Sequence, residues 1–259
     1  MTSRDAIAEA ERRLAAAGVD TPRVDAELIV AHLLGVTRTQ LYADPAREVN
    51  GLEPLLQRRE RREPLAYVLG EWGFRRLTLR TDDRALVPRP ETEILVERSL
   101  ALLDGTSAPR VLDVGVGSGA IALALKDERP DAQVTGVDES EAALELAREN
   151  ANRLHLDVEL RLGGLESASE GWDLVVSNPP YVQSLAGAQP ELRFEPEIAL
   201  VGSGLHEHLA ERARTRALVL EVGDGQAAEV ATALEYLGYR DVRVTPDLAG
   251  IDRVVEGMR

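Results

Sequence analysis

Residues 111–125 read "VLDVGVGSGAIALAL", and the fold of the chain can be worked out from this segment. An apolar strand leads into three spaced glycines, and an apolar helix follows them. Gly115, Gly117 and Gly119 let the backbone turn sharply and let a ligand approach without a Cβ in the way. Asp138 lies twenty-one residues after Gly117, at the end of the next apolar strand, where a carboxylate can accept both hydroxyl hydrogens of a ribose. The pattern predicts a nucleotide-like ligand bound where a strand passes into a helix.

Strands and helices alternate from Pro109 onward. Four strand segments come first, and they read "RVLDVG", "AQVTGVD", "DVELRLG" and "WDLVVSN". Helices are expected between the first three, at about 118–129 and 140–154. Later segments add strands over 217–223, 239–246 and 252–257 and a helix over 225–237. Strands separated by helices of this length form a mostly parallel sheet covered on both faces, so we expect a Rossmann-like α/β domain over residues 91–259.

The first ninety residues have different patterns. Apolar residues recur at helical spacing over 2–17 and 21–34, and a further helix is expected near 51–62, which predicts an all-helical domain over residues 1–70. Apolar residues then alternate over 74–79 and return at 86–87. With a turn expected at Asp82-Asp83, this pattern predicts a β-hairpin over residues 71–90 that joins the two domains.

Composition and charge exclude several classes of protein. The chain has 259 residues, no cysteine and a formal net charge of −15, from 45 acidic and 30 basic residues. Disulfides, thiolate metal sites and cysteine nucleophiles are therefore excluded, and a polyanion would be repelled. No apolar run reaches the roughly 18–20 residues of a membrane span. We expect a cytoplasmic monomer that binds no membrane and makes no direct contact with nucleic acid, and we expect the densest basic run, "LQRRERREP" (56–64), to be the solvated face of a helix.

The glycine loop alone leaves two ligands open. Gly115 and Gly117 with Ala120 satisfy the loose dinucleotide pattern, so a nicotinamide or flavin enzyme has to be considered. Asp113 stands at the carboxyl end of the strand that enters the loop, where we expect its side chain to be available to the ligand. Its charge would repel a pyrophosphate and would attract the ammonium group of a methionine moiety. The loop therefore favours S-adenosylmethionine.

The segment "VVSNPPYV" (175–182) adds chemistry at the end of the fourth strand. Two adjacent prolines cannot donate to a sheet ladder, so the strand must stop there. Ligands of open parallel sheets bind beyond the carboxyl ends of the strands, so the motif should face the glycine loop across one cleft. The carboxamide oxygen of Asn178 and the carbonyl of Pro179 can each accept one hydrogen of a planar NH₂ group, and Tyr181 can lie against its flat face. The motif predicts methyl transfer by orientation, with no metal and no strong base.

Four other polar positions have structural interpretations. His206 and His208 lie two residues apart, which does not place them on one helix face, so we expect an exposed loop or helix start there and no metal site. Arg89 and Glu91 could form an ion pair between the domains or could shape the mouth of the cleft. Glu221 ends a strand, where we expect a carboxylate whose hydrogen bonds are satisfied.

Several segments together resemble the HemK/PrmC family, and the resemblance runs from the N-terminal helices to the C-terminus. They read "DVGVGSGAIALAL", "VSNPPYV", "LVPRPETE" (86–93), "GEWGF" (70–74), "RFEPEIAL" (193–200), "EVGDGQA" (221–227) and "DLAGIDRVVEG" (247–257). Adenine-amino methyltransferases of DNA and RNA share the Asn-Pro-Pro-Tyr signature, whereas "PRPETE" and the terminal segment are more particular to this family. The resemblance implies a methyltransferase that acts on the glutamine in the Gly-Gly-Gln loop of class-1 peptide chain release factors.

The resemblance also implies roles for individual residues. Asn178 would contact both cofactor and substrate, and the helical domain over residues 1–70 would dock the release factor. The cofactor would also be held by Asp138 and by the loop residues Gly115, Val116, Gly117, Ser118 and Gly119. The pocket for the glutamine would be completed by Pro179, Pro180 and Tyr181.

The sequence departs from the family at three places. Val116 stands where the family often has threonine, and the segment between "VGSGLHEHL" and "ALVLEVG" is shorter than usual. Gly163-Gly164-Leu165 replaces an acidic and then an aromatic residue near the adenine, which puts Leu165 at the adenine. Two other hypotheses therefore stay open, an adenine-amino methyltransferase and an inactive cofactor-binding interaction module. The acidic charge disfavours the first, and the intact motif from Asn178 to Tyr181 disfavours the second.

Overall fold

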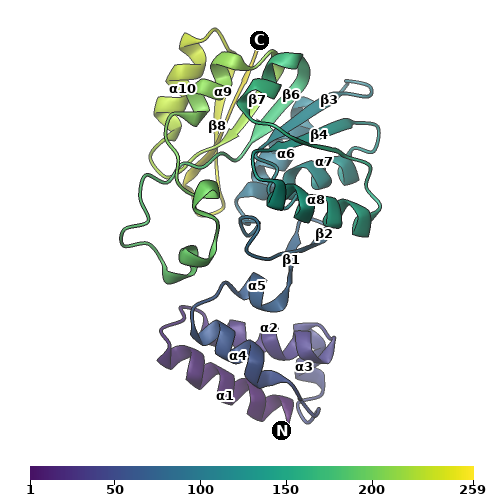
Figure 1. Cartoon of the computed structure of the whole chain (residues 1–259), viewed down its shortest axis with the longest axis vertical. Helices are drawn as coiled ribbons and strands as arrows, with labels where there is room; N and C mark the ends of the chain where they lie inside the picture. The colour runs from purple at the N-terminus through teal and green to yellow at the C-terminus, as the bar shows by residue number, and fades with distance from the viewer. The chain divides into compact units, whose positions relative to one another are not determined.

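The structure is a computed structural model that describes all residues, 1–259. The chain divides into two compact units, one made of Met1–Glu71 with Ala188–Phe194 and the other of Trp72–Gly187 with Glu195–Arg259. Figure 1 shows the helices of the first unit and the sheet and helices of the second. Nothing in the sequence indicated that Ala188–Phe194 belongs with the N-terminal residues.

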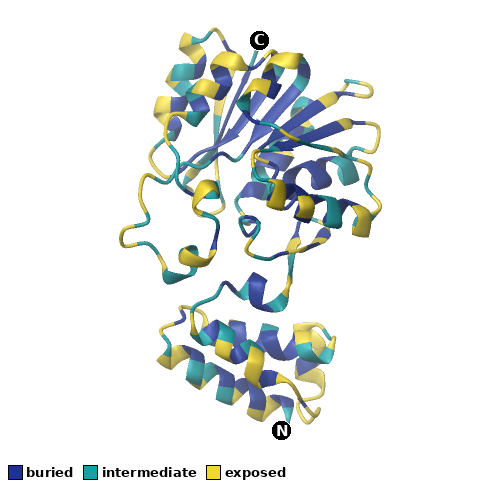
Figure 2. Cartoon of the chain, in the orientation of Figure 1, coloured by how far each residue is buried: buried dark blue, intermediate teal, exposed yellow.

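The first unit is helical. The three helices expected from the sequence are present as α1 (Ser3–Ala16), α2 (Pro22–Leu34) and α4 (Leu52–Glu60). Two short helices that the periodicity did not indicate are α3 (Arg38–Ala43) and α5 (Leu65–Leu69), and a 3₁₀ turn covers Pro190–Phe194. The inner faces of the helices bury one apolar cluster, and Figure 2 shows this alternation of buried and exposed faces.

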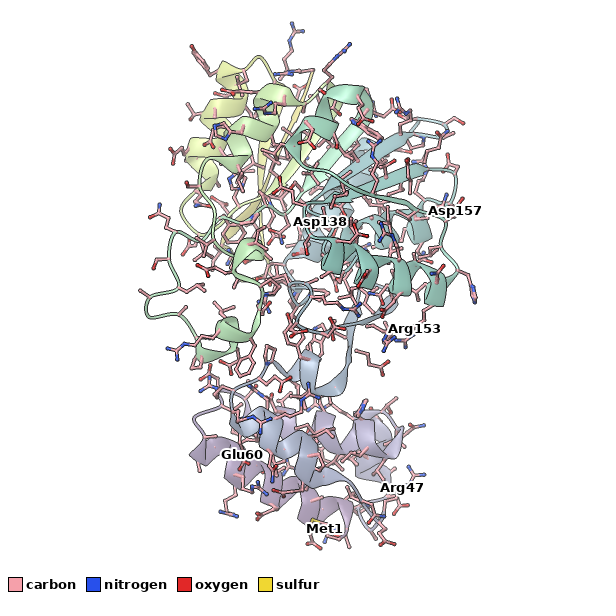
Figure 3. All side chains as sticks on the ribbon, in the orientation of Figure 1. Met1, Arg47, Glu60, Asp138, Arg153 and Asp157 are labelled. Atoms are coloured by element: carbon pink, nitrogen blue, oxygen red, sulfur yellow. The ribbon has the colours of Figure 1, made fainter.

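Ion pairs hold the first unit together on its polar side. Arg13 pairs with Glu53 and with Glu60, each at 2.7 Å. Glu60 is labelled at the end of α4 in Figure 3. Arg59 is buried and bonds both Asp25 at 2.7 Å and Glu191 at 2.9 Å. We expected the basic run over 56–64 to be a solvated helix face, and this expectation holds only in part. Some of its arginines pair with Glu191, in the segment 188–194.

The second unit is built on a seven-stranded sheet in the order β5-β4-β3-β6-β7-β9-β8. The first five strands in this order are parallel, and β9 runs antiparallel to β7 and β8. The strands are β3 (Arg110–Val114), β4 (Gln133–Asp138), β5 (Glu159–Leu162), β6 (Trp172–Ser177), β7 (Thr215–Glu221), β8 (Arg240–Pro246) and β9 (Asp252–Met258). The expectation of a mostly parallel α/β sheet is confirmed.

Helices cover both faces of this sheet. One apolar cluster joins it to α6 (Thr92–Leu102), α7 (Ala120–Glu128) and α8 (Glu141–Leu154). A second cluster joins its other face to α9 (Leu205–Arg212) and α10 (Ala227–Tyr236). The helix α6 was not predicted from the sequence, and α9 was expected only as a possible helix start at residues 206–208. None of the helices has the length and apolar character that a membrane span requires.

The hairpin before the sheet differs from the expectation. It consists of β1 (Glu71–Phe74) and β2 (Leu77–Arg80), so its turn lies at Arg75-Arg76 and not at Asp82-Asp83. The Asp82 carboxylate instead accepts a hydrogen bond from the amide of Arg84 at 3.1 Å, which makes a separate turn. No strand forms at residues 86–87, which line a cavity instead.

Candidate functional site

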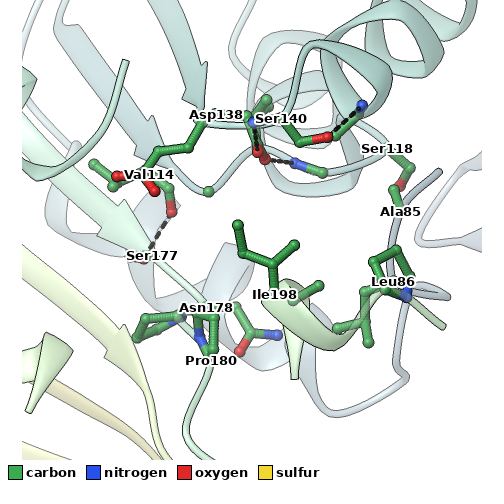
Figure 4. Close-up of a pocket in the computed structure, with 18 of the residues that line it drawn as sticks. Ala85, Leu86, Val114, Ser118, Asp138, Ser140, Ser177, Asn178, Pro180 and Ile198 are labelled. Atoms are coloured by element: carbon green, nitrogen blue, oxygen red, sulfur yellow. Dashed lines mark hydrogen bonds between the residues drawn. The ribbon is translucent and has the colours of Figure 1, made fainter. Parts of the chain in front are cut away.

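A cavity of about 390 Å³ lies within the second unit, beyond the carboxyl ends of β3, β4 and β6. It is lined by the segment from Arg84 to Arg89, the glycine loop, the end of β4, the loop after β5, the end of β6 and the segment from Pro196 to Leu205. Figure 4 shows Asp138 and Asn178 at opposite sides of the view, with Ile198 drawn between them. The expected meeting of the glycine loop and the Asn-Pro-Pro segment in one space is present.

The glycine loop is held by the strand beside it. The amides of Gly115 and Val116 both donate to the carbonyl of Val137 at 2.9 Å. Gly115, Gly117 and Gly119 all have positive φ, at 77°, 54° and 89°. Gly115 to Ser118 line the cavity, whereas Gly119 does not, and a Cβ on Gly119 would lie 2.8 Å from Cδ1 of Leu123. Gly119 therefore lets helix α7 start close to its neighbours, and the other loop residues face the cavity.

Asp138 joins the end of β4 to this loop. Its Oδ2 accepts from the amide of Gly117 and its Oδ1 from the amide of Ser140, both at 2.9 Å. Each carboxylate oxygen has a second lone pair, so Asp138 can still accept two further hydrogen bonds from within the cavity. A ligand with two adjacent hydroxyl groups would meet that requirement.

Asp113 is placed differently from the expectation. Its side chain is 0% exposed, it does not line the cavity, and its Oδ2 accepts from the amide of Ala122 at 3.0 Å. The other oxygen has no partner, and burial raises the pKa of Asp113 to about 7. The expectation that this side chain is available to a ligand is wrong, because it points beneath the loop toward the start of α7.

The four residues after β6 do not all face the cavity. Asn178, Pro179 and Pro180 line the cavity, but Tyr181 does not. The ring of Tyr181 packs against Gly223, since a Cβ added to Gly223 would lie 2.9 Å from Cδ2 of Tyr181. Burial raises the pKa of the Tyr181 phenol to about 12. The interpretation of Tyr181 as a flat face beside a bound NH₂ group is therefore not supported by its position, since the turn at the prolines directs its side chain away from the cavity.

Thr92 and Glu221 lie behind Asn178 and were not assigned to the site from the sequence. The Nδ2 group of Asn178 donates to the Thr92 hydroxyl at 3.4 Å, and Thr92 lines the cavity. Glu221 is 0% exposed, and neither carboxylate oxygen has a hydrogen bond of good geometry, so the expectation of a satisfied carboxylate is wrong. Burial raises the pKa of Glu221 to about 7, and hydrogen bonding to Thr92 opposes that shift. The position of Thr92 inside "PRPETE" was the available signal.

His206 lies at a helix start, which was one of the two expected alternatives, but it is not exposed. It lies in α9, it is buried, and its Nε2 is 2.8 Å from the backbone carbonyl of Glu221. It is therefore not an exposed loop residue, and desolvation lowers its pKa. His208 lies in the same helix. No group of three or more metal-ligating side chains gathers in the structure.

Glu139, directly after β4, is a cavity residue that sequence reasoning missed, and it lies beside the loop after β5. Gly163, Gly164 and Leu165 line the cavity, as does Glu139. A Cβ on Gly164 would lie 2.5 Å from Oε1 of Glu139, so the glycine leaves room for this carboxylate. An acidic group thus lies at this part of the cavity although residue 164 carries no side chain.

Glu195 binds two residues of the segment that lines one side of the cavity. This buried residue pairs with Arg89 at 2.5 Å and accepts a hydrogen bond from the amide of Val87 at 3.0 Å. Arg89 lines the cavity, and Glu91 does not. Of the two interpretations, Arg89 therefore shapes the mouth of the cleft, and its ion pair lies within the second unit.

Two protein families match parts of the chain. Residues 5–70 match the PrmC N-terminal domain, and residues 91–192 match the methyltransferase small domain. Among curated relatives, the release factor glutamine methyltransferase of Deinococcus radiodurans is 41% identical and aligns over 100% of this chain and 99% of its own length. The enzyme of that name from Vibrio cholerae is 39% identical over 99% of this chain and 96% of its own.

Similar solved structures show the fold of the second unit. The catalytic domain of hMettl16, in complex with MAT2A 3′UTR hairpin 6, has a TM-score of 0.55 at 14% identity and covers 70% of this chain and 74% of that one. The tRNA (uracil-54, C5)-methyltransferase of Pyrococcus abyssi, in complex with S-adenosyl-L-homocysteine, has a TM-score of 0.52 at 18% identity. The match covers 73% of this chain and 43% of that one.

Proposed function

Because this chain belongs to the family of release factor glutamine methyltransferases, we propose that it methylates a glutamine side chain of a release factor. The methyl donor is S-adenosylmethionine, and the acceptor is the amide nitrogen of the glutamine in the Gly-Gly-Gln motif of class-1 peptide chain release factors. The observation that carries this proposal is that one cavity is lined by Asp138, the glycine loop and Asn178-Pro179-Pro180. Nucleotide recognition and amide recognition thus share one space.

The residues at one side of the cavity fit the proposed cofactor. A Cβ on Gly115 would meet nothing within 4 Å, so the loop has open space in front of it. Asp138 keeps two lone pairs for a ribose, and Glu139 adds a second negative charge to the lining. Arg84 and Arg89 also line the cavity, but these two neighbouring carboxylates suit a ligand that carries sulfonium and ammonium groups. When bound there, the cofactor supplies a methyl group that is already activated for transfer. We propose that Val116, Ser118 and Leu165, which also line the cavity, contact it.

The residues at the other side fit an amide NH₂ group. Asn178 directs its own Nδ2 group to Thr92, which leaves its Oδ1 to accept one hydrogen of the substrate. The carbonyl of Pro179 is the acceptor that we propose for the second hydrogen. An amide nitrogen is a weak nucleophile because its lone pair is delocalised, so holding both hydrogens fixes the direction from which that lone pair approaches the methyl group. Orientation of this kind lowers the barrier without a strong base.

We propose that the helical unit formed by Met1–Glu71 with Ala188–Phe194 docks the release factor. This role is supported by the match of residues 5–70 to the PrmC N-terminal domain. Since class-1 release factors act in translation, we also propose that the protein works in the cytoplasm, as a monomer.

Mass spectrometry of the substrate tests the proposed reaction. A purified class-1 release factor is incubated with the full chain and S-adenosylmethionine and is then digested. We expect one added methyl group on the peptide that contains Gly-Gly-Gln, with fragment ions that place it on the glutamine side chain. Methylation at another residue, or none at all, would contradict the proposal.

A further inference from the structure

Glu221 is a buried acid without a structural explanation. It ends β7, beside Ser177 and Leu220 at the ends of the paired strands β6 and β7. Its side chain is 0% exposed, and both carboxylate oxygens lack a hydrogen bond of good geometry. Burying such a group is costly unless it is paired, and buried polar atoms in proteins are normally hydrogen-bonded. Packing therefore does not account for a carboxylate at this position.

Two residues near the site face this carboxylate. The hydroxyl groups of Thr92 and Tyr181 both interact with it and lower its pKa, although less than burial raises it. Thr92 in turn accepts a hydrogen bond from the Nδ2 group of Asn178 at 3.4 Å. A chain of polar groups therefore runs from Glu221 through Thr92 to Asn178, and Asn178 lines the cavity.

We propose that Glu221 is a positioning residue that, through the Thr92 hydroxyl, fixes which end of the Asn178 carboxamide faces the substrate. This inference rests on the proposed function of the site. In this arrangement the ionised carboxylate, which can only accept, takes the one hydrogen of the Thr92 hydroxyl. The Thr92 oxygen can then only accept from its other neighbour, and Asn178 must offer its NH₂ group. The oxygen of Asn178 is thereby left for the hydrogen of the substrate amide.

Protonation of Glu221 removes this control. A neutral carboxyl group can itself donate to the Thr92 oxygen, which frees the Thr92 hydrogen to point at Asn178. The carboxamide of Asn178 can then turn over and present its NH₂ group to the cavity. The NH₂ group of Asn178 would then face the NH₂ group of the substrate. Two donors cannot form a hydrogen bond with each other, so the productive orientation would be lost.

The charges around Glu221 place this change near neutral pH. Its pKa is raised to about 7, mainly by burial and also by the charge of Glu91, against the lowering effects of Thr92, Arg253 and Tyr181. The Tyr181 phenol, whose pKa is raised to about 12 by burial, stays neutral over this range. His206 contacts the backbone carbonyl of Glu221, and desolvation lowers its pKa, which favours its neutral form. The carboxylate form of Glu221 therefore increases as pH rises through about 7, and productive orientation increases with it.

The experiment is a single-turnover pH profile with saturating cofactor and release factor. For a group with a pKa near 7, the ionised fraction grows about tenfold between pH 6 and pH 8, so we expect the parent rate to rise by up to about tenfold. Glu221→Gln and Thr92→Val should each give a rate that is lower than the parent at pH 8 by about tenfold or more and that is nearly independent of pH. Affinity for the release factor should stay within about twofold, because neither residue belongs to the docking unit.

Two further variants separate positioning from packing. Thr92→Ser keeps the hydroxyl group and should restore both the rate and its rise with pH. Ser99→Ala removes another buried hydroxyl group from the same helix, α6, where Ser99 donates to the carbonyl of Leu95 at 2.7 Å. It should leave the pH profile unchanged.

The outcomes distinguish this inference from the proposed function. A parent protein that methylates the release factor, together with Glu221→Gln and Thr92→Val variants that keep its rate and its pH profile, would overturn the inference alone. If Glu221→Gln does not fold, Thr92→Val decides the matter by itself, and a pH rise retained in that variant would overturn the inference. A parent protein that methylates no release factor would overturn the proposed function and this inference with it.

Discussion

The carboxylate of Asp138 accepts a hydrogen bond from the amide of Gly117 at 2.9 Å, so the acidic end of β4 and the glycine loop hold each other in place. The sequence separates these residues by twenty-one positions, and the parallel pairing of β3 with β4 brings them together. One residue thus has two roles in the site. It holds the Gly117 amide with one lone pair on Oδ2 and the Ser140 amide with one on Oδ1, and it keeps the remaining two for a ligand.

Asp138→Ala should weaken binding of S-adenosylmethionine by about 1.5–3 kcal/mol, the range for hydrogen bonds to a charged group. The variant loses the acceptors for the ribose hydroxyls and also the partner of the Gly117 amide. Isothermal titration calorimetry on the folded variant measures the loss. Asp157→Ala removes an exposed acid that does not line the cavity and serves as the matched control. Equal affinities for the parent and Asp138→Ala would mean that the ribose is held elsewhere.

Asn178→Ala should reduce methyl transfer far more than it reduces affinity for the release factor. Docking over the helical unit is untouched, whereas loss of orientation acts on the barrier, where each 1.4 kcal/mol is about tenfold in rate. We expect a fall of about two orders of magnitude or more in the single-turnover rate. Asn178→Asp should also be impaired, because it loses the NH₂ group that Thr92 accepts. Asn152→Ala, an exposed position on α8, is the control. A rate for Asn178→Ala within a few-fold of the parent would refute the orientation mechanism.

Gly136→Ala should displace Val116 of the glycine loop, because the added methyl group on β4 would clash with it. A Cβ at this position on β4 would lie 2.6 Å from Cγ2 of Val116 and 3.0 Å from Cδ2 of Leu160. Overpacking of this kind costs about 1–3 kcal/mol. We expect a loss of that size in the free energy of unfolding measured in urea, together with weaker cofactor binding. The double variant Gly136→Ala, Val116→Ala should recover much of the stability, since the smaller side chain makes room. No recovery would show that the strain falls on Leu160 instead.

The two buried acids should make stability depend on pH in an unusual direction. Burial is the main cause that raises the pKa of both Asp113 and Glu221 to about 7, above their ordinary values of 3.8 and 4.5. The folded state therefore holds these protons more tightly than the unfolded state, and the resulting stability is complete at acidic pH and is lost as pH rises through about 7. Glu221→Gln, which cannot ionise, should gain stability relative to the parent between pH 5 and pH 8 by an amount on the order of 1–3 kcal/mol.

Urea unfolding at the two pH values measures this difference. Glu145→Gln changes an exposed acid on α8, and its stability curve should run parallel to that of the parent. A Glu221→Gln curve that is also parallel to the parent would contradict the raised pKa. If the prediction holds, ionisation of Glu221 costs stability in the same pH range in which it is proposed to orient Asn178.

The sequence predicted the parts of this site that rest on local pattern. Glycine spacing, an acidic strand end and two prolines after a strand are short-range features, and the parallel sheet follows from alternating periods. Side-chain direction was not predictable in the same way. Asp113 and Tyr181 stand in the expected positions of the chain, but one points beneath the loop and the other toward Gly223.

Long-range contacts account for the rest of what was missed. Thr92 and Glu221 are 129 positions apart, and Glu191 reaches Arg62 of the first unit at 2.7 Å across a similar separation. No periodicity or local motif connects such residues, since the contact depends on how β6, β7 and the start of α6 meet. The contact of Glu139 with Gly164 is also long-range. The carboxylate of Glu139 fits there because Gly164 has no side chain.

Transfer of a labelled methyl group to three substrates tests the central claim most directly. The full chain is incubated with labelled S-adenosylmethionine and, separately, with a class-1 release factor, with the same factor carrying Gln→Ala in its Gly-Gly-Gln motif, and with DNA. The account predicts label in the first release factor alone. Label in DNA but in neither release factor would contradict it and would favour an adenine-amino methyltransferase, and label in none of the three would favour an inactive binding module.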